Sequence, residues 1–297
     1  MSRTFTYSGS EPVRVNKWLA QSGVCSRREA EGLITDGLVS VEGEKVTSPG
    51  HKILPGQTLS LAARANAALD SKLTVLLNKP VGYVSGTPEG EQIPAVRLLT
   101  RKALHGESEV IPGRRHKLAP VGRLDQDSHG LLILSEDGVV AKAVIGPDSE
   151  MTKEYLVRVR GVITPDRIAK LRHGLNLDGR RLKKAEVTEV SPQKLRFVLK
   201  EGRNRQIRRM CDLVELRVVD LQRIRIGPIE LGSLPEGQWR PLTDEERTAL
   251  IAAGAPKRPT RQGPAPASAA PRQDAKRPAG KARRPGKRPG SRGPAGR

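Results

Sequence analysis

The sequence predicts an α+β fold whose main sheet is mixed but largely antiparallel. Between residues 73 and 250, helix-like and strand-like patterns alternate along the chain. Strands separated only by short turns, such as KAEVTEV and KLRFVLK, occur too often for a doubly wound parallel sheet. With 297 residues, the chain is long enough for one to three domains, each with a buried core.

The first predicted domain covers residues 12–61 and follows a leader, residues 1–11, that we expect to be flexible. The segment VRVNKWLAQSGV has apolar residues near helical spacing. A second helix is expected after Ser26, which can form a capping box with Glu29, and a glycine suited to ending this helix follows. Glycine and Pro-Gly turns divide the rest of the domain into short strands.

Four basic side chains lie on these two predicted helices. Two charges at the start of one helix would ordinarily be solvated, but four on consecutive helices favour contact with RNA. Two short helices followed by a small sheet resemble the RNA-binding module named after ribosomal small-subunit protein S4, the alpha-L motif. The RNA contacts predicted for this domain are Arg14, Lys17, Arg27 and Arg28.

The larger domain is expected at residues 73–250, after a polar, alanine-rich linker at residues 62–72. Its first apolar strand stops at Pro80, because proline cannot continue a strand ladder. The later elements that we expect are strand LLILSE, helix VVAKAVIG, strand KEYLVRVRG, helix TPDRIAKLRHG, strands KAEVTEV and KLRFVLK, and helix NRQIRRMCDLV.

Positive charge dominates the chain, with a formal net charge of +21. The last 43 residues hold thirteen Lys or Arg against one acid, and the preceding 254 residues carry 40 basic against 31 acidic groups. Such an excess indicates a polyphosphate partner, because each neutralised phosphate releases counterions. Residues 251–297 are rich in proline, glycine and alanine, so we expect a tail that is disordered when free.

Membrane and secreted classes are disfavoured by the sequence. No apolar run approaches the roughly 18 residues that span a bilayer, and no basic amphipathic helix or lipidation signal accompanies the tail. The first residues lack the apolar core of a signal peptide. Cys25 and Cys211 form no Cys-x-x-Cys pair, which argues against a zinc ribbon and fits a reducing cytoplasm.

The stretch VGRLDQDSHGLLILSEDG, residues 121–138, leaves three interpretations open. Its aspartates could belong to a solvated turn, to an aspartyl phosphotransferase that uses magnesium, or to a site with one catalytic carboxylate. The second interpretation requires a buried strand that leads into Asp125, whereas the strand-like run here comes afterwards. Asp127 is predicted to be a structural turn or cap residue.

Two other segments favour a catalytic carboxylate. KEYLVRV places Tyr155 early in a strand, and LKEGRNRQIRRMC carries a row of arginines from a glycine turn into a helix. Asp125, Tyr155 and Arg208 together would make a compact site of a carboxylate, an aromatic face and a guanidinium.

The motifs GRLDQDSHGLL, KEYLV and EGRNRQIRRM, with NKPVGYVSGT and GQWRPLTDEE, resemble those of the RNA pseudouridine synthases of the RsuA group. The resemblance spans about residues 13–247 and implies an S4-type module followed by an α+β catalytic domain. The Asp-Ser pair in the first motif and the segment NRQIRRMCDLVELRVVDLQRIRIG are most similar to the F-type branch, RluF, which acts on 23S ribosomal RNA. The long basic tail departs from the pattern.

This resemblance implies a role for three residues in the isomerisation of uridine to pseudouridine. Asp125 would be the nucleophile or base while uracil is detached from ribose, turned and rejoined through carbon. Arg208 would pair with Asp125 and keep it ionised in a dry pocket. Tyr155 would lie against the target uracil and help to remove a proton from the ring.

The resemblance also implies the surroundings of the reaction. Arg123 matches the position that can replace a flipped-out base, and Leu124 and Ile207 would line an apolar pocket. Neither a metal nor an organic cofactor is expected, and the protein is expected to act on RNA as a monomer, with transfer RNA left open as a second substrate. The remaining predicted RNA contacts are Arg203, Arg205 and Arg209.

The main alternative is a non-catalytic RNA-binding factor in ribosome assembly that keeps the fold without turnover. The charge and the N-terminal module fit both functions, whereas the combined catalytic motifs favour the enzyme. A phosphotransferase would depend on magnesium and form an acyl phosphate on Asp125, neither of which we expect.

Deletion of residues 255–297 is expected to weaken RNA binding at low salt without changing sequence preference. Its cations are spread among Pro, Ala and Gly, so they can contact phosphates but read few bases. The measurement is the dissociation constant for RNA across a salt series, with and without the tail. Equal affinities at low salt would contradict the prediction.

Overall fold

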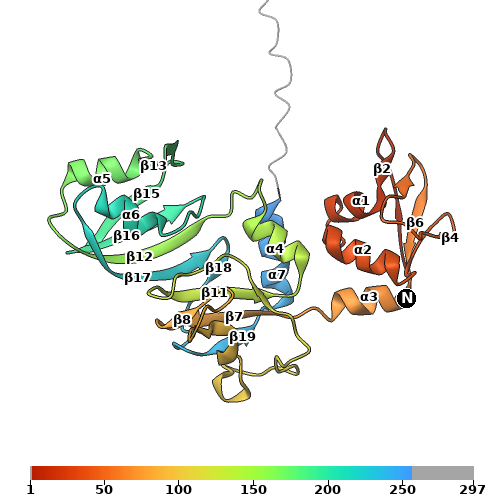
Figure 1. The fold of residues 1–297 in the computed structure, drawn as a ribbon, viewed down its shortest axis with the longest axis horizontal. Coiled ribbons are helices and arrows are strands. Elements are labelled where there is room, and N and C mark those ends of the chain that lie inside the picture. Colours follow the sequence, from red (N-terminus) through yellow and green to blue (C-terminus); the bar gives the residue numbers. More distant parts are fainter. Residues whose placement is uncertain (1, 256–297) are drawn as a thin grey trace, which may run out of the picture. The chain divides into compact units, whose positions relative to one another are not determined.

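The N-terminal module joins two helices to a small antiparallel sheet (Figure 1). The computed structural model describes residues 2–255, so the predicted tail, residues 251–297, lies outside the described residues from residue 256 onward. The sheet has the strand order β1-β6-β3-β4, and β2 pairs separately with β5. The bounds are β1 (Arg3–Thr6), β2 (Val13–Arg14), α1 (Val15–Gln21), α2 (Arg27–Thr35), β3 (Val39–Val41), β4 (Glu44–Lys45), β5 (Lys52–Ile53) and β6 (Thr58–Leu61).

Helix α2 begins with the predicted capping box. The hydroxyl of Ser26 accepts a hydrogen bond from the backbone N–H of Glu29 at 3.3 Å, and the Glu29 carboxylate accepts one from the backbone N–H of Ser26 at 2.6 Å. Gly37 follows the helix with φ 65°, a left-handed conformation that glycine adopts without steric cost. This part of the sequence prediction is confirmed.

Two segments at the borders of this module are more ordered than predicted. Residues 3–6, expected in a flexible leader, form β1, which pairs with the edge of β6 and brings Phe5 onto the module's core. The expected linker, residues 62–72, contains helix α3 (Ala63–Asp70), in which Ala65 is fully buried. Both predictions were wrong because they relied on polar composition. Residues 3–6 pair with the open edge of β6, and the alanines of residues 62–72 favour a helix.

The larger domain is built on a nine-stranded mixed sheet with the order β15-β16-β12-β17-β11-β7-β19. Strand β10 pairs with β11, and β18 pairs with β17. The predicted class, α+β on a largely antiparallel sheet, is confirmed. The strand bounds are β7 (Thr74–Lys79), β10 (Ala119–Pro120), β11 (His129–Ser135), β12 (Lys153–Arg160), β15 (Glu186–Ser191), β16 (Lys194–Leu199), β17 (Arg217–Ile226), β18 (Ile229–Glu230) and β19 (Trp239–Pro241).

Helices and short ladders complete this domain (Figure 1). Strands β8 and β9 form one two-stranded pair, and β13 and β14 form another. Two 3-10 turns lie between β9 and β10. The bounds are β8 (Tyr83–Val84), β9 (Ile93–Pro94), η1 (Ala95–Leu98), η2 (Arg101–Ala103), α4 (Gly138–Ile145), α5 (Pro165–Arg172), β13 (Asn176–Leu177), β14 (Arg180–Arg181), α6 (Gln206–Asp212) and α7 (Asp244–Gly254).

The large sheet is buried on both faces around β11. Leu131 and Ile133 belong to a hydrophobic cluster with residues of α4 and α7, whereas Leu132 and Leu134 belong to a cluster with residues of α6. Successive side chains of a strand point to opposite faces, so both faces need apolar residues. This explains why the sequence here is a continuous apolar run rather than an alternating one.

Helix α7 carries the folded domain beyond its predicted end at residue 250. Thr243 and Glu246 form a capping box at its start, and Leu250 is fully buried in the cluster shared with β11. Residues 251–254, which the sequence assigned to the tail, continue this helix. These four residues have no helical apolar pattern of their own, but they extend a helix that is capped at Thr243 and anchored by Leu250.

Strands β11 and β17 form the one parallel pairing within the described large sheet, at two residues each. Gly130 of β11 has φ 102° and lies opposite Arg223 of β17. A Cβ atom at Gly130 would overlap the carbonyl oxygen of Arg223 and lie 2.9 Å from its backbone nitrogen. The absence of a side chain at residue 130 therefore permits the two backbones to meet.

Gly130→Ala is expected to destabilise the domain by more than the roughly 1–2 kcal/mol that a left-handed conformation costs an L-residue, because it adds a backbone clash. Gly179→Ala is the matched control, since Gly179 has φ 71° and nothing within 4 Å of an added Cβ. The measurement is the free energy of unfolding in denaturant. Equal losses in the two variants would show that conformation alone, rather than the β11–β17 contact, requires Gly130.

Candidate active site

The loop between β10 and β11 presents Asp125 at the start of a well-anchored turn. The hydroxyl of Ser85 donates to the carbonyl of Leu124 at 2.6 Å and accepts from its N–H at 2.9 Å. The N–H of Gly82 donates to the carbonyl of Gln126 at 2.9 Å. Both partners come from the segment that follows Pro80, so hydrogen bonds to the loop backbone hold the loop and this segment together.

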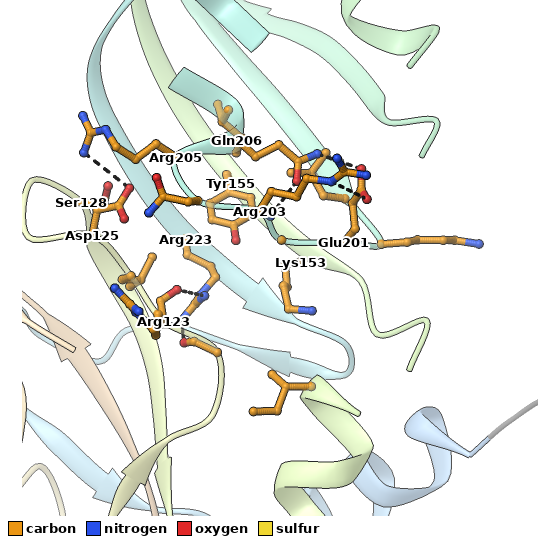
Figure 2. A pocket seen from close by; sticks show the side chains of 18 of the residues that line it. Arg123, Asp125, Ser128, Lys153, Tyr155, Glu201, Arg203, Arg205, Gln206 and Arg223 are labelled. Carbon is orange, nitrogen blue, oxygen red and sulfur yellow. Dashed lines mark hydrogen bonds and ion pairs between the residues drawn. The ribbon is translucent and has the colours of Figure 1, made fainter. Parts of the chain in front are cut away.

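A pocket of about 740 Å³ opens beside Asp125 (Figure 2). Tyr155 lies in its middle on β12, with Asp125 at one end and Lys153 toward the other. The structure therefore brings the predicted carboxylate, aromatic and guanidinium groups to one cavity. The predicted site residues that line it are Arg123, Leu124, Asp125, Tyr155, Arg203, Arg205, Ile207 and Arg208.

The ion pairs at this pocket differ from the prediction. Arg208 was expected to pair with Asp125, but its Nη2 lies 3.2 Å from the carboxylate of Asp127 and donates to the carbonyl of Asp127 at 2.8 Å. The cation nearest Asp125 is Arg205, at 3.7 Å. Arg205 is the N-cap residue of α6, in a left-handed conformation with φ 48°, and this places two arginines over the Asp127 turn.

Asp127 is thus more than the turn residue that the sequence predicted. Arg205 donates to both of its carboxylate oxygens, at 3.1 and 2.9 Å. Burial alone would raise the pKa of Asp127, but the hydrogen bonds from Arg205 and the charges of Arg208 and Arg205 lower it below its usual value. Asp127 therefore offsets part of the charge of both arginines, and Asp125 keeps a half-exposed carboxylate, 30% accessible, rather than a fully dry one.

Tyr155 and Arg208 form the buried wall of the site. Tyr155 is 8% exposed and pairs across the sheet with Phe197 of β16 and Arg223 of β17. Arg208 also donates to the hydroxyl of Ser128 at 3.0 Å. Its Nε is buried and has no hydrogen-bond partner among the described residues. One N–H of the buried guanidinium thus stays unsatisfied within the described part of the chain.

The predicted RNA contacts on the arginine-rich segment are partly held within the protein. Arg203 lies 3.6 Å from Glu201, and Arg209 pairs with Asp178 at 2.6 Å outside the pocket lining. Their role in RNA binding stays a prediction.

Several lining residues were missed by the sequence analysis: Ser128, Lys153, Lys183, Lys200, Gln206 and Arg223. Lys153 had a usable signal, because it lies two positions before Tyr155 in KEYLV and alternate residues of a strand share a face. Burial and the nearby charge of Arg223 lower the pKa of Lys153 to about 8. Arg223 had no comparable signal, because its position opposite Tyr155 depends on the sheet order.

The N-terminal module brings three of its four predicted cations together. Arg14, Lys17 and Arg27 line a shallow hollow of about 380 Å³, joined there by Lys52, while Arg28 is not among its lining residues. Lys52 comes from β5, which pairs with β2, so the sheet adds a cation that the helix pattern did not reveal.

The described residues show neither a metal cluster nor a membrane-spanning helix. Within residues 2–255, no group of three or more His, Cys, Asp or Glu side chains is arranged to hold a metal ion. In the same part of the chain, no helix has the length and apolar character needed to cross a bilayer.

Comparison with known proteins identifies this arrangement. A family described as RNA pseudouridylate synthase matches residues 73–213, and the S4 domain matches residues 13–59. The dual-specificity RNA pseudouridine synthase RluF of Escherichia coli K12 is 36% identical over 80% of this chain and 78% of its own length. The chain belongs to the RNA pseudouridine synthase family. The predicted placing in the RsuA group, near RluF, is confirmed.

Other relatives agree with this assignment. An uncharacterized RNA pseudouridine synthase of Aquifex aeolicus is 34% identical over 81% of this chain and 94% of its own length. A crystal structure of a pseudouridylate synthase matches 80% of this chain and 99% of its own with a TM-score of 0.56 and 26% identity. The protein is therefore an enzyme that isomerises uridine to pseudouridine in RNA.

RNA binding by this synthase is expected to weaken as the pH rises through 8, because the Lys153 ammonium in the pocket loses its charge. Lys153→Met should bind RNA more weakly at pH 7 and lose most of this pH dependence.

The same titration of Lys153 has the opposite effect on protein stability. The unfolded lysine keeps its proton up to about pH 10.5, so the contribution of Lys153 to the unfolding free energy rises between pH 8 and 10.5.

The measurement is the dissociation constant for RNA between pH 7 and 9 at constant ionic strength. Lys170→Met, at an exposed position on α5, is the control and should keep the wild-type profile. An unchanged pH profile in Lys153→Met would show that Lys153 does not contact RNA.

Proposed function

We propose that this synthase modifies a uridine of large-subunit ribosomal RNA and that Asp125 carries the reaction. The observation that supports this most directly is the shared pocket of Asp125, Tyr155 and Arg208. The reaction breaks the bond between N1 of uracil and C1′ of ribose, turns the base and joins C5 to C1′. The C5 proton then leaves and N1 gains one, so the product is an isomer of the substrate.

Asp125 is placed to act as the nucleophile or base on the ribose or the uracil. Its carboxylate faces the pocket beside Arg205, with the buried cations Lys79 and Arg223 near the same loop. These positive charges favour a negative group and a negatively charged substrate at this position. We assign Tyr155 to contact with the face of the uracil, because its ring lies between Asp125 and Lys153 (Figure 2).

The target uridine must leave its helix to reach Asp125, since the carboxylate lies in a concave site. Extrusion of a base costs a few kcal/mol, which contacts with the flipped base and the RNA backbone can offset. We assign this second task to Arg123, whose exposed side chain lies at the pocket beside the loop. Leu124 and Ile207 supply buried apolar contacts.

The choice of RNA rests on the N-terminal module and on the relatives. In the N-terminal module, the cationic hollow of Arg14, Lys17, Arg27 and Lys52 offers contacts to RNA phosphates in addition to those at the pocket. The name of the RluF relatives, dual-specificity RNA pseudouridine synthase, supports a second RNA substrate, for which transfer RNA is our candidate. We further propose that the protein works in the cytoplasm as a monomer without an organic cofactor or metal.

Asp125→Ala is expected to abolish pseudouridine formation while RNA affinity is retained, because the carboxylate takes part in bond exchange rather than in holding phosphates. The measurement is pseudouridine content of ribosomal RNA from cells that lack the gene, after treatment with each purified variant. Asp166→Ala, an exposed aspartate in the first turn of α5, is the control and should be fully active.

Equal product from Asp125→Ala and wild type would overturn the assignment of Asp125. Absence of product from the wild-type protein on all cellular RNA, with binding intact, would favour the assembly factor considered from the sequence.

A further inference from the structure

Arg223 of β17 is a buried cation without a buried anion. Its side chain is 1% exposed, and among the described residues no carboxylate forms an ion pair with it. Moving a charge out of water is costly, and an apolar residue of similar size would usually serve stability as well or better. The presence of an arginine here therefore calls for a reason other than stability.

The guanidinium of Arg223 donates its hydrogen bonds to backbone carbonyls. Its Nε donates to Leu131 at 2.8 Å, its Nη1 to Arg123 at 3.2 Å and its Nη2 to Gly122 at 3.1 Å. Two of these carbonyls lie two and three residues before Asp125 in the loop that carries it. Figure 2 shows Arg223 below Tyr155, with these bonds directed to the backbone at Arg123.

The place of Arg223 in the sheet links it to the other side of the site. Arg223 is the direct partner of Tyr155 in the antiparallel β12–β17 ladder and of Gly130 in the parallel β11–β17 ladder. Residues directly opposite in an antiparallel pair have neighbouring side chains on one face. One residue therefore contacts the strand of Tyr155, the strand that follows Asp125 and the loop itself.

We propose that Arg223 is a positioning residue for the isomerisation. Its forked guanidinium fixes the carbonyls of Gly122 and Arg123 and so sets the placement of Asp125 relative to Tyr155. This inference rests on the proposed role of Asp125 in the reaction. A lysine at residue 223 would keep the charge but present a single ammonium, which cannot reproduce the planar fork over three separated carbonyls.

The test is Arg223→Lys, with three measurements on the full-length protein: the single-turnover rate constant at saturating RNA, the dissociation constant for RNA and the melting temperature. We expect the rate constant to fall by about 10²-fold, the order that a displacement of about 1 Å costs at a reacting group. The dissociation constant should stay at the wild-type value, because lysine keeps the positive charge and residue 223 is only 1% exposed.

Arg225→Lys is the matched control. Arg225 lies two positions further along β17, is 42% exposed and pairs with Glu154 and Glu230 at 3.4 and 2.9 Å. The same substitution there removes a guanidinium fork from the strand without touching the loop. Its rate constant should equal that of the wild-type protein.

Ser85→Ala provides a second test that does not depend on how Arg223 variants fold. Ser85 holds the same loop from its other side through both backbone groups of Leu124. Loss of this hydroxyl should also lower the rate constant with unchanged RNA affinity. In Arg223→Ala, added guanidinium ion should restore part of the rate, whereas methylammonium should not.

A wild-type rate constant in Arg223→Lys would overturn the inference, as would a rate loss matched by an equal loss in the folded fraction or in RNA affinity. The failure of this inference is separable from failure of the proposed function. An inactive Asp125→Ala with a fully active Arg223→Lys would refute only the positioning role, whereas an active Asp125→Ala would refute the role of Asp125 on which it rests.

Discussion

The contact between β11 and β17 at Gly130 sets the geometry on which the rest of the site depends. Strand β17 lies between β12, which carries Tyr155, and β11, which follows the Asp125 loop. Because Gly130 has no side chain, the backbones of these strands meet where the sheet changes from antiparallel to parallel pairing. Any outward shift of β17 would separate Tyr155 from Asp125. The missing side chain at Gly130 therefore controls the distance between two residues that lie 30 positions apart in the chain.

The cations at and around this site are of two kinds, arginines paired with carboxylates and buried cations without a carboxylate partner. On the side of α6, Asp127 pairs with Arg205, and outside the pocket lining Asp178 pairs with Arg209, so both arginines are already partly neutralised. Lys153 and Arg223 in the pocket lining, and Lys79 near the Asp125 loop, have no ion-pair partner among the described carboxylates, and burial lowers the pKa of both lysines to about 8. Buried positive charge without a counter-ion favours a polyanionic ligand, and RNA supplies such a charge.

The pairing of Asp127 with two arginines also explains why Asp125 stays accessible. A carboxylate held by bidentate hydrogen bonds is committed to structure, and Asp127 takes this place. Asp125, two residues away, has one cation at 3.7 Å and an open side toward the pocket. Asp125 and Asp127 belong to the same turn but have different roles, because Arg205 at the start of α6 lies closer to Asp127 than to Asp125.

Features that depend on neighbours in the chain were readable from the sequence. The Ser26 capping box, the doubly buried strand at residues 131–134 and helix α4 follow from local pattern. The motifs around Asp125, Tyr155 and Arg208 were sufficient to select the family and three side chains of one pocket. The border segments were predicted less well, because the order of β1 and α3 comes from packing on the N-terminal core rather than from their own composition.

By itself the sequence determined which residue types could do the chemistry, since local patterns and motifs place a carboxylate, a tyrosine and arginines on a loop, a strand and a helix. Only the tertiary structure decided which of these groups meet. It paired Arg208 with Asp127 rather than Asp125 and placed Arg223 beneath Tyr155. The physical reason is that ion pairs and cross-strand neighbours depend on sheet order, register and helix placement, which residues far apart in the chain set together.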